Sequence, residues 1–201
     1  MRYPYVGGIE NRNMKKLLIL LTVISVLSGC SNKKLSPSEA VEEYYAAFDS
    51  SNFERLISLV DDSLTIVEGE FLSTYNHDSF YQQFKWDSIF QPTYEVIRIE
   101  EESDHVIATV SSHSLRYEFL KNNPLTSKFK ISLNSGKISR IELVGYEGAD
   151  FEVWQKERDS LVKWVNTNHP ELDGFVNDLT INGSKNYLKA IELYENRKDA
   201  L

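Results

Sequence analysis

The residues that most often carry out chemistry form no recognisable catalytic or metal-binding pattern in this chain. The histidines are His77, His105, His113 and His169. A continuous strand would place His105 and His113 on one face, but no third ligand can be assigned beside them. No serine lies in a Gly-x-Ser-x-Gly turn, and no glycine-rich loop could hold a phosphate. The sequence therefore predicts no metal site, no cofactor and no catalytic group of these kinds.

The single cysteine, Cys30, ends a short apolar segment. Lys15 and Lys16 precede the apolar run 17–27. A helix needs about 20 apolar residues to cross a bilayer, so this run is too short to anchor the protein alone. A basic start, a short apolar core and small residues at the end are typical of a secretory signal peptide. A lone cysteine also excludes a disulfide within the chain.

The residues before Cys30, Leu27-Ser28-Gly29, resemble the lipobox of bacterial lipoproteins, in which an aliphatic residue and two small residues precede a cysteine. The resemblance implies a diacylglyceryl thioether on Cys30, cleavage of the signal peptide (residues 1–29), and acylation of the new amino group with a chain such as palmitate. Two or more acyl chains hold a protein firmly where one does not. We therefore expect residues 30–36 to be a lipidated tether, with the rest of the protein outside the cytoplasm, on a membrane of the bacterial envelope.

Composition limits the other partners. The whole chain has a net charge of −8, and the basic leader makes the remainder more acidic still. Such a charge argues against binding nucleic acid and against lying flat on anionic lipid, so the lipid on Cys30 must make the attachment. Because Lys15 and Lys16 directly follow Met14, we expect Met14 to be the true start and residues 1–13 to be a mis-assigned extension.

Two short amphipathic helices are predicted at the start of the domain. Ser36-Pro37-Ser38-Glu39 is a capping box with proline at the first helical position. Residues 51–54 form a second capping box, and Asp61-Asp62 is expected to end the second helix. The apolar faces, at i, i+3, i+4 and i+7, are Val41, Tyr44, Tyr45 and Phe48, then Phe53, Leu56, Ile57 and Val60.

Strands dominate the middle of the chain and helices its end. Strands are expected over 64–67, 94–100, 106–119, 129–133 and 138–144, with a hairpin turn at Asn134-Ser135-Gly136. Helices are expected after caps at Asp78, Asp150 and Ser184, and over 172–179, with His169-Pro170 ending the longest. This order predicts an α+β fold.

Residues 40–66 resemble the opening of the nuclear transport factor 2-like superfamily, which includes SnoaL-like polyketide cyclases and ketosteroid isomerases. There an aromatic pair on the first helix is followed by a turn Asp/Asn-x-x-Asp/Asn-Phe/Leu and a helix Leu-x-x-Leu-Phe-x-Asp-Asp; residues 49–53 and 56–62 stand in those places. The resemblance covers about residues 37–146. It implies a curved antiparallel sheet wrapped around the first helices as a cone, with a pocket at the open end and a helical extension over 147–201.

The resemblance also implies candidate site residues. In the ketosteroid isomerases a tyrosine of the first helix and a neutral aspartic acid donate to an oxyanion, while another aspartate moves the proton. Tyr44 or Tyr45 matches the tyrosine. Glu68 lies near the place of the base but one residue later, a shift that turns a strand side chain to the other face. The plainer interpretation makes the two tyrosines core or pocket wall and Glu68 an exposed strand residue, so no catalytic residue is assigned.

Three functions follow from these features. The first is a non-enzymatic, membrane-anchored lipoprotein whose cone binds a small apolar ligand or an envelope partner. The second is an enzyme of isomerase or cyclase type that uses Tyr44 or Tyr45 with Glu68. The third is a structural or assembly subunit, for example a homodimer paired through the open sheet face. The interior of the cone discriminates among them: buried acids beside a tyrosine favour the enzyme, an apolar lining favours binding, and a filled cone favours assembly.

Replacing the lipidated residue tests the attachment. We expect Cys30→Ser to release the protein from membranes, because the serine hydroxyl cannot form the thioether. Fractionation of cells expressing each form measures this. A serine variant that stays bound to membranes and is released only by detergent would contradict lipid attachment through Cys30.

Overall fold

The computed structural model describes residues 34–198. The predicted signal peptide, its start at Met14 and the lipidation site Cys30 lie outside the described residues. Among residues 34–198 no helix is both long and apolar enough to cross a membrane.

The first helix, α2 (Pro37–Asp49), begins where the sequence predicts. The Ser36 hydroxyl accepts from the Glu39 amide, and the Glu39 carboxylate accepts from the Ser36 amide at 2.8 Å, which confirms the capping box. Helix α3 (Phe53–Leu59) is capped by Asn52, one residue later than predicted. It ends before Val60, because Val60 pairs with Ile138 in the sheet. Asp61-Asp62 therefore lies in a strand and not at a helix end.

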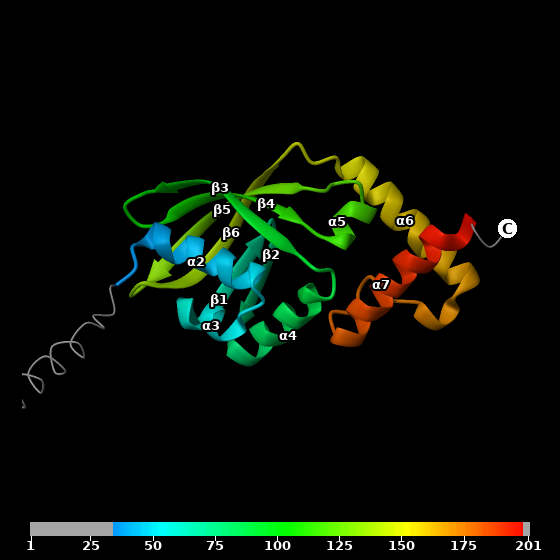
Figure 1. Ribbon diagram of the computed structural model, residues 1–201, viewed down its shortest axis with the longest axis horizontal. Helices are drawn as coiled ribbons and strands as arrows, with labels where there is room; N and C mark the ends of the chain where they lie inside the picture. The colour runs from blue at the N-terminus through cyan, green and yellow to red at the C-terminus, as the bar shows by residue number, and fades with distance from the viewer. Residues whose placement is uncertain (1–33, 199–201) are drawn as a thin grey trace, which may run out of the picture. The chain divides into compact units, whose positions relative to one another are not determined.

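Six strands form one open sheet in the order β2-β1-β6-β5-β4-β3 (Figure 1). All neighbours are antiparallel except β1 and β6, which are parallel. The predicted hairpin between β5 and β6 is confirmed: Ser135 and Gly136 both have positive φ, as a tight two-residue turn requires. The strands are β1 (Val60–Glu68), β2 (Phe71–Tyr75), β3 (Thr93–Glu101), β4 (Val106–His113), β5 (Leu125–Asn134) and β6 (Lys137–Glu147).

The curved sheet and the first helices enclose the main core. Helix α2 lies across the sheet, where it packs on β3, β4 and β6, and α3 packs on β1 and β6 (Figure 1). Val41, Leu56, Val110 and Ile131 are fully buried between them. The α+β fold class with a curved, open and mostly antiparallel sheet is thus the one that the sequence predicts.

The structure also differs from the predicted elements between residues 71 and 119. The strand expected over 106–119 stops at His113, and the chain turns into helix α5 (Leu115–Phe119), capped by Ser114. Strand β2 was not predicted, because its side chains are mostly exposed and give no alternating pattern. Helix α4 (His77–Ser88) is capped by Asn76 and not by Asp78.

The C-terminal helices form a second core with the ends of α4 and α5. They are α6 (Phe151–Asn168), α7 (Ile181–Glu195) and the 3-10 turns η1 (Pro170–Leu172) and η2 (Asn196–Lys198). The helix expected over 172–179 is only η1 and irregular turns. Thr180 caps α7, and Ser184, the expected cap, is fully buried one turn further on. The buried residues of this second core are Trp86, Phe90, Phe119, Leu120, Leu161, Val165, Leu172, Phe175, Tyr187, Ala190 and Ile191.

Two polar links join the C-terminal helices to the sheet domain. The Trp86 indole donates to the Asp178 carbonyl at 3.1 Å. The Asn122 amide side chain donates to the Asp150 carbonyl at 3.0 Å and accepts from the Asp150 amide at 2.7 Å. The segment before α7 is therefore fixed to the end of α4. The start of α6 is fixed to the segment that follows α5.

Gly183 provides a test of the first link, between Trp86 and Asp178. A Cβ at this position would collide with the carbonyl and side chain of Asp178, the residue that accepts from Trp86. Alanine is otherwise the better helix former by about 1 kcal/mol. We nevertheless expect Gly183→Ala to lower the free energy of unfolding by about 1–3 kcal/mol, measured by urea titration.

The matched control is Gly145→Ala, because nothing lies within 4 Å of a Cβ built there. It should change stability by no more than about 0.5 kcal/mol. Equal stability of the two variants would contradict the prediction, because the segment around Asp178 would then make room for the new Cβ without a loss of folding free energy.

Candidate functional site

The side of the sheet that faces α2 and α4 contains a cavity of about 510 Å³. All six strands contribute to its wall, together with α2, α4, α5 and Leu179 from the segment before α7. Most of the lining is aromatic or aliphatic, as Phe48, Phe84 and Phe129 illustrate. The interior of the cone is therefore hollow, and its wall combines many apolar side chains with a substantial share of polar groups.

Tyr44 and Tyr45 both line this cavity. Tyr45 faces the sheet, with its ring centre 5.8 Å from that of Tyr94 on β3 and 6.5 Å from that of Phe129 on β5. Tyr44 contacts Phe48 on its own helix, with ring centres 5.2 Å apart. Both rings are buried, and the structure records no hydrogen bond between either hydroxyl and a described residue. The two hydroxyls are thus available to a molecule in the cavity.

Glu68 also lies in the cavity wall, at the exposed end of β1. It shares a strand face with Leu64, which is buried in the core, and with Ile66, which lines the cavity. The one-residue displacement from the family spacing therefore does not turn it away from the pocket, and the pairing register of β1 with β6 shifts by a bulge between Val60 and Thr65. The structure brings the three candidate residues to one cavity, with Glu68 the only exposed member.

Sequence reasoning missed three polar residues of the wall, Asp87, Tyr94 and Arg116. They come from α4, β3 and α5, which are distant in sequence and meet only in the folded chain. The Tyr94 hydroxyl donates to Asp87 at 2.7 Å, and the Tyr94 amide donates to Asp49 at 3.0 Å. No motif or spacing signals this arrangement.

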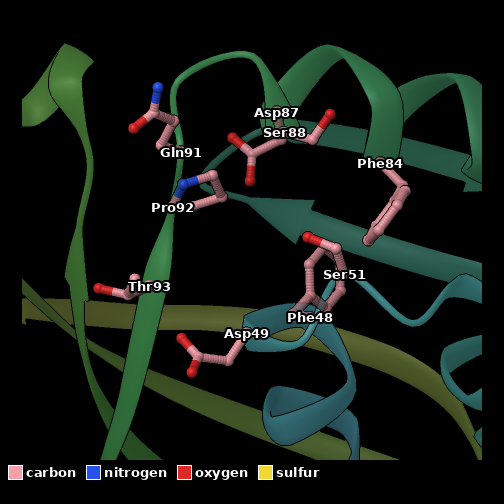
Figure 2. Close-up of a pocket in the computed structure, with 9 residues that line it drawn as sticks. All are labelled: Phe48, Asp49, Ser51, Phe84, Asp87, Ser88, Gln91, Pro92 and Thr93. Carbon is pink, nitrogen blue, oxygen red and sulfur yellow. The ribbon is translucent and has the colours of Figure 1, made fainter.

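Asp87 stands between the cavity and a smaller cleft of about 270 Å³. Figure 2 shows this cleft, with Asp87 at the end of α4 on one side and Asp49 at the end of α2 on the other. Phe48 and Phe84 separate it from the larger space, since both line the two hollows. The two carboxylates thus accept hydrogen bonds from a single residue, Tyr94, near the start of β3.

Arg116 projects from α5 among aromatic rings. Its guanidinium carbon lies 5.0 Å from the ring centre of Trp86, 5.4 Å from that of Phe90 and 5.3 Å from that of Tyr117. Burial lowers the pKa of the guanidinium, but Tyr117 and Asp87 raise it by more, so the net shift is upward. Arg116 therefore stays charged at any physiological pH.

The tyrosines of the wall are held neutral. Burial raises the pKa of Tyr44 and Tyr45 well above the ordinary value, and the nearby Asp87 carboxylate raises that of Tyr44 further. Burial and then Asp87 do the same to the pKa of Tyr94. These hydroxyls can donate hydrogen bonds but cannot act as bases near neutral pH. The wall thus holds neutral donors, one half-buried acid, one exposed acid and one cation.

The histidines lie elsewhere. His105 contacts Asp104 at 2.7 Å and Glu102 at 3.3 Å, and His169 contacts Glu171 at 3.2 Å. His77 lies 3.9 Å from Asp62, and His113 is exposed at the end of β4. Within residues 34–198 no group of three or more histidine, cysteine or acidic side chains could hold a metal ion.

Comparison with known proteins finds similarity only among solved structures. No protein-family model matches the chain, and no curated protein matches it either. An NTF2-like protein of unknown function from Cytophaga hutchinsonii is 12% identical, with a TM-score of 0.46 over 57% of this chain and 93% of that one. IdmH, a proposed polyketide cyclase from Streptomyces antibioticus, is 17% identical, with a TM-score of 0.47 over 62% and 99%. Bal32a, from a soil-derived mobile gene cassette, is 16% identical, with a TM-score of 0.49 over 60% and 94%.

The buried tyrosines predict a loss of stability in alkali. Tyrosine has a pKa near 10 in the unfolded chain and a higher one in the folded state, so its contribution is complete below pH 10 and is lost as the pH rises toward the folded value. We expect the free energy of unfolding to fall above pH 10. In Tyr45→Phe the fall should be less steep by up to about 1.4 kcal/mol per pH unit, measured by urea titration at several pH values. An identical slope in the variant would contradict burial of the Tyr45 hydroxyl.

Proposed function

We propose that the protein is a lipoprotein of the bacterial envelope whose cone binds a small, predominantly apolar ligand. The observation that supports this is the cavity itself, with its aromatic and aliphatic lining and its few polar groups. A volume of about 510 Å³ falls within the roughly 300–1,000 Å³ of pockets that enclose small molecules. The unpaired hydroxyls of Tyr44 and Tyr45 supply directional contacts among the apolar side chains of the wall.

The proposed attachment places this binding site at a membrane surface. The signal peptide and the lipobox at Cys30 argue for export and acylation, and residues 30–36 are long enough to separate the domain from the lipid. The acidic composition gives the domain itself no affinity for anionic lipid. The tether therefore keeps the cavity near the membrane, where apolar molecules concentrate.

An isomerase or cyclase is the second candidate. Asp87, hydrogen-bonded to Tyr94 in the cavity wall, favours it, because enzymes of this kind move a proton with a carboxylate beside a tyrosine. Such a site pairs one acid with a second, neutral acid. Here the other acid of the wall, Glu68, is exposed, so the geometry supports binding better than proton transfer. Assembly through a filled cone has the least support, since the cone is hollow.

Filling the cavity tests the binding function. Ser127 is buried on β5 and lines the cavity, so Ser127→Phe should occupy part of the space and weaken binding of the neutral fluorescent probe N-phenyl-1-naphthylamine at least about tenfold, or about 1.4 kcal/mol. Ser132→Phe is the matched control, because Ser132 alternates to the other face of the same strand. A thermal melt of each variant checks folding, and Ser127→Leu serves as a smaller replacement.

Two results would argue against this function. Equal probe affinity in Ser127→Phe, Ser132→Phe and the parent chain would show that the cavity is not where apolar molecules bind. Turnover of a steroid or polyketide-like substrate that disappears in Tyr44→Phe, Tyr45→Phe, Glu68→Gln or Asp87→Asn, with unchanged melting, would favour the enzyme instead.

A further inference from the structure

Arg116 is a charged residue in the cavity wall, and the described residues place no carboxylate within ion-pair distance of it. Four other arginines of the described chain each have an acidic partner, at 2.8 to 3.5 Å: Arg55, Arg98, Arg140 and Arg158. Those four lie on the surface, where pairing contributes little. The arginine inside the cavity is thus the one whose charge is best able to act on a ligand.

The surroundings of Arg116 fix its orientation without neutralising it. Trp86, Phe90 and Tyr117 lie around the guanidinium at 5.0 to 5.4 Å, so aromatic faces occupy the positions where water would otherwise solvate the cation. A partly desolvated cation without an anion is unfavourable, and an anion that reaches it restores the lost interaction. A guanidinium presents two parallel N–H groups that match the two oxygens of a carboxylate.

The other charges of the wall limit what anion is accepted. Asp87 already accepts a hydrogen bond from Tyr94, and Glu68 is exposed to solvent at the end of β1. Asp87 is near enough to raise the pKa of Arg116, but neither acid forms an ion pair with it within 4.0 Å, and both repel additional negative charge. One cation facing two acids is suited to a single negative charge, so a carboxylate fits better than a phosphate dianion.

The rest of the cavity requires an apolar body on the same molecule. Its exposed apolar residues are Phe71, Tyr146 and Leu179, which are 80%, 39% and 65% exposed and also line the cavity. Large apolar side chains exposed around a hollow are typical of a binding mouth. The polar contacts available beyond Arg116 are mainly the neutral tyrosine hydroxyls.

We infer that the cavity binds apolar monocarboxylic acids, with the carboxylate held by Arg116 and the apolar body packed against the aromatic wall. This inference rests on the proposed binding function and adds the ligand class and its anchoring residue. Tyr44 and Tyr45 contact the ligand as neutral donors or through their rings. The exposed residues at the mouth cover the end of the body that is farthest from the carboxylate.

The test compares each acid with its neutral amide. The pairs are 2-naphthylacetate with 2-naphthylacetamide, and decanoate with decanamide. Isothermal titration uses the full chain, purified from cells and held in phosphatidylcholine nanodiscs, with empty discs as the blank. The parent should bind each acid at least about tenfold more tightly than its amide. In Arg116→Gln the acid should lose about 10–100-fold in affinity, while the amide keeps the parent affinity. Arg55→Gln, outside the cavity, is the matched control and should bind as the parent does.

The possible results of this titration distinguish the carboxylate inference from the proposed binding function. Arg116→Lys keeps the positive charge but loses the two parallel N–H groups, and it should bind the acid with intermediate affinity. If Arg116→Gln has a lower melting temperature than the parent, Arg116→Lys replaces it in the comparison. Equal affinity of acid and amide in the parent would overturn the carboxylate inference and leave the proposed binding function standing. Equal losses for acid and amide in Arg116→Gln would overturn it too, because Arg116 would then only support the wall. Binding of neither member of either pair would overturn the inference and the proposed function together.

Discussion

The packing of Arg116 on Trp86 is the contact on which the cavity depends. Trp86 is nearly fully buried, lines the cavity, belongs to the second core and donates its indole N–H to Asp178. Arg116 lies over the same ring, on a short helix whose Phe119 is buried in the second core. The C-terminal helices therefore hold in place the part of the cavity wall that contains Arg116. A sheet and its first helices alone would enclose an apolar hollow without a positioned cation.

The cavity wall depends secondly on the hydrogen bonds of Tyr94. Asp49 and Asp87, from the ends of α2 and α4, accept from its amide and its hydroxyl. One residue at the start of β3 thus connects two helices to the edge strand of the sheet. The same bond occupies the only half-buried carboxylate of the wall. The wall thereby combines neutral tyrosine hydroxyls with a single cation, Arg116, for which the described residues provide no ion pair within 4.0 Å. That combination is the chemistry of a binding site for an amphipathic molecule.

Local features of the sequence predicted the structure wherever local interactions decide it. The capping box at Ser36 and the hairpin at Ser135-Gly136 are confirmed because each needs only neighbouring residues. The predicted helix at Val60 and the predicted strand after His113 were wrong, because long-range contacts override the local patterns there. Val60 pairs with Ile138, and α5 packs on the second core. For the same reason Tyr44 and Tyr45 could be proposed from one helix. Asp87, Tyr94 and Arg116 could not, because α4, β3 and α5 meet only in the folded chain.

The most direct test of the central claim is a crystal structure of the chain bound to 2-naphthylacetate. The account predicts the naphthyl ring inside the cavity against Tyr45 and Phe129, with both carboxylate oxygens within about 3 Å of the Arg116 guanidinium. A ligand bound outside the cavity, or one whose carboxylate points to the solvent at Phe71 and Leu179 with Arg116 uncontacted, would contradict it.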